Sequence, residues 1–260
     1  MKTIKAIFFD IDGTLVSFKT HTIPPSAIQA IHAAREKGVK IFIATGRPMP
    51  FIDNLGALEY DGIITVNGAL CATSEGKVLY LSPVCAADLA RLILYHKANP
   101  FPIAFASDKE VFLTGTNSQT DEIFRLLKVR PTDIRPIEHC LDMSVMQIIA
   151  FFPEDNEAAI MSDVLKGCTA HRWHPYFADI ISEGNSKSSG IDTMLRHYGI
   201  PLSEAMAFGD GGNDISMLRH VAHGVAMGNA DDKVKAAARY VTASVDDHGV
   251  ACMLKSFLEL

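Results

Sequence analysis

The sequence predicts an α/β fold, in which a Rossmann-like parallel sheet is interrupted by an inserted α/β domain. Short apolar runs such as residues 7–9 and 205–208 indicate strands that are buried on both faces. Helical patterns separate these runs, and alternating strands and helices favour a parallel sheet with right-handed crossovers. Between residues 82 and 183 the pattern changes to strands and helices punctuated by prolines, which indicates a second domain.

The composition is that of a globular protein with a sizeable core: 260 residues, of which 48% are hydrophobic and 21% charged. A formal net charge of -6 argues against binding to nucleic acid or to an anionic membrane. No apolar run approaches the roughly 20 residues of a membrane helix, and the N-terminus has no signal-peptide pattern. The five cysteines are scattered and odd in number, which indicates reduced thiols. We therefore expect a cytoplasmic protein.

The first expected strand, residues 7–9, runs directly into Asp10-Ile11-Asp12-Gly13-Thr14. Ligands of open α/β sheets bind beyond the carboxyl ends of the strands. Residues two apart in an extended chain point to the same side, so the carboxylates of Asp10 and Asp12 can converge. Since two close carboxylates repel each other, a hard cation such as Mg²⁺ is the simplest partner for them. The alternative is an Asp-Gly turn in which Asp12 caps the next helix.

A second motif follows the next strand. A helical pattern from residue 26 ends at Gly38, and the strand over residues 39–44 leads into Thr45-Gly46-Arg47-Pro48. Proline favours the first turn of a helix, so we expect a helix to begin at Pro48. A hydroxyl and free backbone N–H groups at a helix N-terminus can bind phosphate, which makes Thr45 and Gly46 candidate ligands. The alternative is a threonine cap without a ligand.

A third strand and a small hairpin are expected before the inserted domain begins. A third strand over residues 62–66 precedes the turn signal Asn67-Gly68 and a small hairpin formed by residues 70–73 and 77–81. The inserted domain is expected to have a mainly antiparallel sheet, and its dispersed charges indicate no particular chemistry. Its expected helices cover residues 86–97, 120–127 and 156–165, and its expected strands residues 103–106, 111–113, 146–152 and 178–181. The predicted domains are residues 1–81 with 184–260, and residues 82–183.

The first pattern returns after residue 183. Lys187 falls at the start of a helix, where the helix dipole disfavours a cation, so Lys187 is a candidate anion ligand; the alternative is an ordinary surface lysine. The strand over residues 205–208 ends in Gly209-Asp210-Gly211-Gly212-Asn213-Asp214, whose polar groups favour a further metal ligand over a solvated loop. The last expected elements are a strand over 221–227, a helix over 231–238, a strand over 240–242 and a helix over 249–258.

Together these motifs resemble those of the haloacid dehalogenase (HAD) superfamily of phosphatases, in its Cof-type branch with a C2B-type α/β cap. The resemblance covers essentially the whole chain, and all four motifs occur in order at a predicted strand end or helix start. Ser188 is a local departure, because many relatives carry glycine there. The four motifs are Asp10-Ile11-Asp12-Gly13-Thr14-Leu15, Ala44-Thr45-Gly46-Arg47, Ser186-Lys187 and Gly209-Asp210-Gly211-Gly212-Asn213-Asp214.

The resemblance implies a role for each motif residue. Asp10 would be the nucleophile that forms an aspartyl-phosphate, and Asp12 the general acid and base. Mg²⁺ would be bound by the Asp10 carboxylate, the Asp12 backbone carbonyl and Asp210. Asp214 would orient metal-bound waters or the lysine. The expected phosphate ligands are Thr45, Gly46, Lys187 and Asn213.

The implied activity is Mg²⁺-dependent hydrolysis of small phosphate monoesters, most plausibly sugar phosphates, by a monomer or weak dimer without nucleic-acid or membrane partners. One alternative is a phospho-accepting signalling module, which has no equivalent of Asp12 and no long cap. Another is a phosphosugar mutase, which usually carries a small helical cap between the first two motifs. Residues 16–24 are too few for such a cap.

Overall fold

The computed structural model describes residues 4–127 and 133–259 and divides the chain into two compact units. The first unit contains the chain up to Arg47, Ile52–Leu81 and the chain from Ser186 onward; the second contains Pro48–Phe51 and Ser82–Asn185. The predicted boundary after residue 183 falls two residues before that of the structure, and the sequence does not assign residues 48–51 to the second unit. We propose this division as the domain organisation.

The first unit is built on a sheet that has eight strands among the described residues, in the order β14-β13-β12-β1-β2-β3-β4-β5. The apolar strand β1 (Ala6–Phe9) lies in the middle and pairs in parallel with β2 (Lys40–Ala44) and β12 (Ala205–Gly209). The parallel part also includes β3 (Gly62–Thr65), β13 (His223–Ala226) and β14 (Tyr240–Val241). A meander of β4 (Leu70–Thr73) and β5 (Val78–Leu81) continues the sheet in antiparallel sense.

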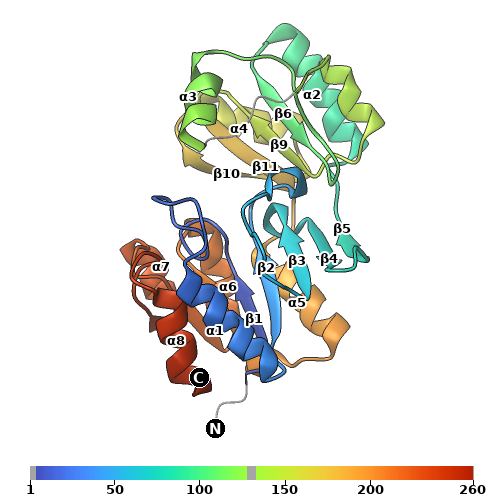
Figure 1. Ribbon diagram of the computed structural model, residues 1–260. Coiled ribbons are helices and arrows are strands. Elements are labelled where there is room, and N and C mark those ends of the chain that lie inside the picture. The colour runs from blue at the N-terminus through green and yellow to red at the C-terminus, as the bar shows by residue number, and fades with distance from the viewer. Residues whose placement is uncertain (1–3, 128–132, 260) are drawn as a thin grey trace. The chain divides into compact units, whose positions relative to one another are not determined.

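Helices cover both faces of this sheet (Figure 1). On one face, α5 (Lys187–Tyr198), α6 (Ile215–His220) and α7 (Asp232–Ala237) bury Met194, Met217 and Val234 against strand residues such as Phe8 and Phe42. On the other face, α1 (Pro25–Glu36) packs beside α8 (Gly249–Leu258). Coverage on both faces explains why β1 is apolar at every position.

The second unit has its own sheet, in the order β10-β11-β9-β6-β7-β8 within the described residues. All its pairings are antiparallel except that of β7 with β8, in agreement with the expected mainly antiparallel sheet. Helix α2 (Ala86–Ala98) packs through Leu89, Leu92 and Ile93 into one apolar core, and α3 (Ser118–Leu127) contributes Ile123 to a smaller one with Phe151. The strands are β6 (Ile103–Ala106), β7 (Val111–Leu113), β8 (Asp133–Ile134), β9 (Gln147–Ala150), β10 (Cys168–His174) and β11 (Phe177–Ser182).

Three local expectations need correction. The segment after Pro48 is only a three-residue 3₁₀ turn, Met49–Phe51, because Pro50 has no N–H and disfavours a helical conformation of the residue before it. The pattern over residues 156–165 is a short helix α4 (Glu157–Ala159) that continues as a π-helix, Ile160–Val164. Strands β8 and β10 were not predicted. Among the described residues, no helix is both long and apolar enough to cross a membrane.

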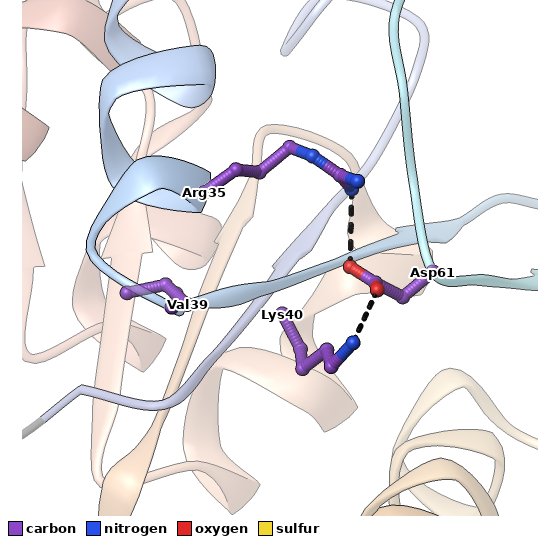
Figure 2. Close-up of a pocket in the computed structure, with 5 residues that line it drawn as sticks. Arg35, Val39, Lys40 and Asp61 are labelled. Carbon is purple, nitrogen blue, oxygen red and sulfur yellow. Dashed lines mark hydrogen bonds and ion pairs between the residues drawn. The ribbon is translucent and has the colours of Figure 1, made fainter.

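A cavity of about 140 Å³ lies at the amino ends of the strands, where Lys40 begins β2 and Asp61 precedes β3 (Figure 2). The Asp61 carboxylate accepts hydrogen bonds from Arg35 at 3.1 Å, from Lys40 at 2.7 Å and from the backbone N–H of Ile41 at 2.9 Å. The ion pairs tie α1 to the sheet at the edge opposite the strand carboxyl ends. The charged groups at this cavity therefore pair with one another, and the predicted site residues lie elsewhere.

Candidate active site

A buried lysine joins two of the predicted motifs at the carboxyl ends of the central strands. Nζ of Lys187 donates to Oδ1 of Asp10 and to Oδ1 of Asp214, each at 2.5 Å. Lys187 and Asp214 are fully buried, and Asp10 is nearly so. Asp10 directly follows β1, and Asp214 ends the loop that follows β12. The sequence therefore predicted correctly that these separate segments carry polar groups to one place.

The start of α5 explains how a lysine is held there. Ser186 is the N-cap, and its Oγ accepts from the backbone N–H of Ser189 while Oγ of Ser189 accepts from the N–H of Ser186. This capping box fixes the first turn and leaves Lys187 as the first helical residue. The turn after β3 approaches this cap closely: Gly68 has φ +101°, and a Cβ there would collide with the carbonyl of Ser186. Only glycine fits that position.

Burial and crowding of carboxylates raise the pKa values of the acidic groups. Burial, with repulsion from Asp214, raises the pKa of Asp10 well above its usual value, although Lys187 opposes this. Burial raises the pKa of Asp210 to about 7, against the hydrogen bond from Thr14, which lowers it. Burial lowers the pKa of Lys187, but the facing Asp10 and Asp214 outweigh burial, so its pKa is raised. The lysine therefore stays charged, and the raised pKa values of Asp10 and Asp210 show that one lysine does not offset the burial and mutual repulsion of these carboxylates.

This acidic cluster fits a divalent cation. Carboxylate oxygens of Asp10, Asp210 and Asp214 lie within 4.8 Å of one another. Among the described residues, the fully buried Asp214 accepts three hydrogen bonds, from Lys187 at Oδ1 and from the backbone N–H groups of Asp210 and Gly211 at Oδ2, whereas Asp10 accepts one from Lys187 and Asp210 accepts two. Asp10 and Asp210 are therefore the side chains best suited to coordinate an ion. Oxygen ligands and carboxylates that crowd one another favour a hard cation such as Mg²⁺.

Asp210 is held by neighbours from two other loops. Its Oδ1 accepts from Oγ1 of Thr14 at 2.8 Å, and its Oδ2 accepts from Nδ2 of Asn229 at 3.0 Å. Gly13 has φ +81°, and a Cβ there would collide with Oδ2 of Asp210. Glycine is thus required for both the backbone angle and the close approach of this carboxylate.

The predicted phosphate ligands gather beside the second motif. A Cβ on Gly46 would lie 3.2 Å from Oδ1 of Asn67 and 3.3 Å from Nδ2 of Asn213. Nδ2 of Asn213 donates to Oδ1 of Asn67 at 3.0 Å. Thr45 is buried, and its Oγ1 accepts from the backbone N–H of Arg47 at 3.1 Å. The structure thus brings Gly46 and Asn213 together through Asn67, next to Thr45.

Asp12 does not point its carboxylate at a phosphate ligand or at Lys187. Both of its oxygens accept from Arg47: Oδ2 from Nε at 2.7 Å and Oδ1 from Nη2 at 2.6 Å. The hydrogen bonds and charge of Asp12 raise the pKa of Arg47 despite its burial. Asp12 also lies close enough to Asp10 and Asp210 to raise their pKa values. The proposed acid–base carboxylate is therefore beside the cluster and is oriented by an arginine.

Three polar residues of the site were missing from the predicted ligands. They are Arg47, Asn67 and Asn229. Asn67 was taken only as part of a turn, although it follows the carboxyl end of β3 directly, and it adopts a left-handed conformation with φ 49°. Asn229 follows β13 in the same way. Both asparagines lie just beyond the carboxyl end of a strand, and this position is the sequence signal that could have identified them as site residues.

Comparison with known proteins places the chain in a family. The family model for haloacid dehalogenase-like hydrolases matches residues 7–254. The putative phosphatase YkrA of Bacillus subtilis is 28% identical over 257 residues, with 96% of each chain covered. Among solved structures, the HAD subclass IIB sugar phosphatase BT4131 is 44% identical with a TM-score of 0.88, covering 98% of this chain and all of that one. BT1666 of Bacteroides thetaiotaomicron, a HAD phosphatase, is 36% identical with a TM-score of 0.92, covering all of this chain and 97% of that one.

The family match spans nearly the whole chain, and each of these relatives is covered along nearly its full length. The resemblance based on four short motifs is therefore confirmed. Together with the acidic, lysine-containing site at the strand ends, these similarities show that the chain belongs to the haloacid dehalogenase-like hydrolases and is a phosphatase.

Proposed function

We propose that this protein hydrolyses small phosphate monoesters, most specifically sugar phosphates, through an aspartyl-phosphate on Asp10 and with Mg²⁺. The observation that carries the proposal is the contact of Lys187 with both Asp10 and Asp214. A fully buried lysine between two carboxylates opposes the rise that burial causes in the pKa of Asp10, and it places a positive charge beside the carboxylate that would meet the phosphate group.

The reaction would have two steps. In the first, a carboxylate oxygen of Asp10 attacks phosphorus, the bond from phosphorus to the ester oxygen breaks, and Asp12 gives a proton to the departing alcohol. In the second, Asp12 takes a proton from water, whose oxygen attacks phosphorus, and the bond to Asp10 breaks to release inorganic phosphate. The roles of Asp10 and Asp12 are those that the family resemblance implies, and the positions of both residues at the end of β1 are compatible with them.

The remaining site residues would bind and orient the phosphoryl group. Thr45, the backbone N–H of Gly46, Lys187 and Asn213 would supply the hydrogen-bond donors and the positive charge that phosphoryl transfer requires. Asp10, the backbone carbonyl of Asp12 and Asp210 would hold Mg²⁺, with Asp214 supporting Lys187 and the loop of Asp210. When bound, Mg²⁺ would offset the negative charge of phosphate next to carboxylates.

The proposed substrate class rests on two observations. BT4131 is described as a sugar phosphatase, and this chain matches it over its full length. The second unit is an α/β domain of the kind expected to cover the substrate, which favours a small phosphate ester over a macromolecule. We also propose that the protein acts in the cytoplasm, as a monomer or weak dimer, without nucleic-acid or membrane partners.

The test is phosphate release from a panel of hexose, pentose and triose phosphates, with Mg²⁺ and with EDTA. We expect Mg²⁺-dependent release that is highest for a sugar phosphate and absent in Asp10→Asn. Asp192→Asn is a matched control, because Asp192 pairs with His220 on the helical face of the same unit. An acid quench with ³²P-labelled substrate should leave label on the peptide that contains Asp10.

Each part of the proposal has its own contradicting result. Phosphate release that is equal in EDTA contradicts the metal. Labelled protein without release of phosphate indicates a phospho-accepting module, and transfer of the label to a second sugar indicates a mutase. Retained activity in Asp10→Asn removes Asp10 as the nucleophile.

A further inference from the structure

We propose that Asn229, outside the four motifs, is a positioning residue for the cation site, because it fixes the carboxylate of Asp210 and the loop that follows Asp12. This inference rests on the proposed function, since it concerns how the chain prepares its acidic cluster for a divalent ion. Asn229 lies in the loop after β13, between this strand and α7.

The side-chain amide of Asn229 connects three segments that are far apart in the sequence. Its Nδ2 donates to the carbonyl oxygen of Gly13 at 2.9 Å and to Oδ2 of Asp210 at 3.0 Å. Its Oδ1 accepts from the backbone N–H of Val245 at 3.0 Å. A backbone N–H can only donate, so the contact with Val245 fixes which end of the amide faces Gly13 and Asp210. Each amide group therefore has a partner of the right kind.

The side chain of Asn229 is exposed, so water could satisfy its amide equally well. Three contacts to three loops therefore indicate orientation of those loops rather than relief of a buried polar group. Asp210 is the group that this contact orients most directly, because its other oxygen already accepts a hydrogen bond from Thr14. With both oxygens held, the carboxylate keeps one orientation toward Asp10.

The loop that anchors Asn229 also anchors the chain beyond the first motif. Asp246 follows Val245 and accepts from Oγ of Ser17 at 2.6 Å and from Nζ of Lys19 at 2.7 Å. Residues 13–19 are thus held at two points by the loop over residues 244–247. Asn229 bridges Gly13 and Val245, and Ser17 donates to Asp246 directly. This arrangement gives the loop before α8 a part in holding the acidic cluster. Partners that orient metal ligands typically change metal affinity by about 10- to 100-fold when removed.

The test is the affinity for Mg²⁺, measured by isothermal titration calorimetry on the full chain without substrate. We expect Asn229→Ala to bind Mg²⁺ about tenfold more weakly than the wild type. In steady-state assays the Mg²⁺ concentration for half-maximal activity should rise by the same factor, while kcat at saturating Mg²⁺ stays within about twofold. Asn99→Ala is the matched control, since Asn99 is exposed and donates to a backbone carbonyl in the other unit.

Asn229→Ser, which keeps a small polar side chain but cannot span the three contacts, gives the same comparison if the alanine variant does not fold. Wild-type affinity in a folded Asn229 variant overturns the role of Asn229 and leaves the proposed function intact. A wild type that binds no divalent cation overturns the metal in the proposed function, and the role of Asn229 with it. Equal weakening in Asn99→Ala also overturns the inference, because the effect is then not specific to the site.

Discussion

Arg47 holds Asp12 by two hydrogen bonds, one to each carboxylate oxygen. Paired donors of this kind fix the plane of a carboxylate as well as its position. The pair connects the loop after β1 with the loop after β2, so the second motif orients the residue proposed as general acid in the first. Arg47 lies in the second motif but was not among the predicted site residues, and the structure gives it a defined partner.

Replacing Arg47 should therefore affect substrates according to their leaving groups. In Arg47→Met, we expect kcat/KM for an alkyl phosphate to fall about 100-fold and that for p-nitrophenyl phosphate by less than about tenfold. An alkoxide needs a proton to depart, whereas nitrophenolate does not. Arg35→Met is a suitable control, because the Arg35 side chain is 27% exposed, against 29% for Arg47, and pairs with Asp61 at the opposite edge. An equal fall for both substrates would show that Arg47 does not act through Asp12.

Lys187 should be required for stability as well as for activity. Lys187→Met leaves the buried Asp10 and Asp214 without a counter-charge, which typically costs about 3–5 kcal/mol of unfolding free energy. Urea unfolding and phosphate release measure the two effects separately. The double variant Lys187→Met/Asp214→Asn removes one of the stranded charges and should recover part of the stability without activity. Full stability in Lys187→Met contradicts the buried ion pairs.

The metal-free protein should become less stable as the pH rises. The pKa of Asp210 is raised by burial to about 7 in the folded chain, so the folded state binds a proton more tightly than the unfolded state. Stabilisation by that proton is complete below about pH 4 and is lost as the pH rises through about 7. Thermal unfolding in EDTA should show this loss, and Asp210→Asn should reduce it. Added Mg²⁺ should raise Tm more at pH 8 than at pH 5, because protons compete with the ion; an equal shift contradicts the site.

The cysteines should react with maleimide in two groups. Burial raises the pKa values of the Cys71 and Cys168 thiols to about 12 and that of Cys140 to about 11, so few thiolates form there. Cys85 and Cys252 are exposed. We expect the exposed pair to be labelled first at pH 7.5, as read by peptide mass spectrometry, and the other three only after unfolding. Early labelling of Cys71 contradicts its place in the core.

The sequence predicted that polar side chains would meet at one edge of the sheet, because the end of a buried strand can be recognised from the sequence. Continuous apolar runs identify buried strands, and the carboxyl ends of parallel strands meet at one edge, so Asp10 and Asp210 had to lie near each other. Lys187 was identified by its unfavourable place at a helix start. The contacts that hold these residues were not predictable in the same way. Arg47, Asn67 and Asn229 act across loops whose proximity depends on strand order, which local patterns do not specify.

The errors in the fold have local causes. Strand β10 contains two histidines and an arginine, so it lacks the apolar alternation of a half-buried strand, and it lies at the edge of its sheet. The helix expected after Pro48 gives way to a 3₁₀ turn because a second proline follows two residues later. Residues 128–132, where the chain was expected to leave the helix over 120–127, lie outside the described residues.

The central position of β1 has a consequence for how the protein is made. Strand β1 pairs with β12, so the middle of the first sheet stays open on one side until the ribosome has synthesised nearly the whole polypeptide. Ser82–Asn185, in contrast, emerges as one continuous segment with nearly all of its own unit. Domains generally fold as units during synthesis. We expect nascent chains arrested when Asn185 but not β12 has left the ribosome to hold a protease-resistant inserted unit and an unprotected N-terminal segment, so the enzyme completes its active site last.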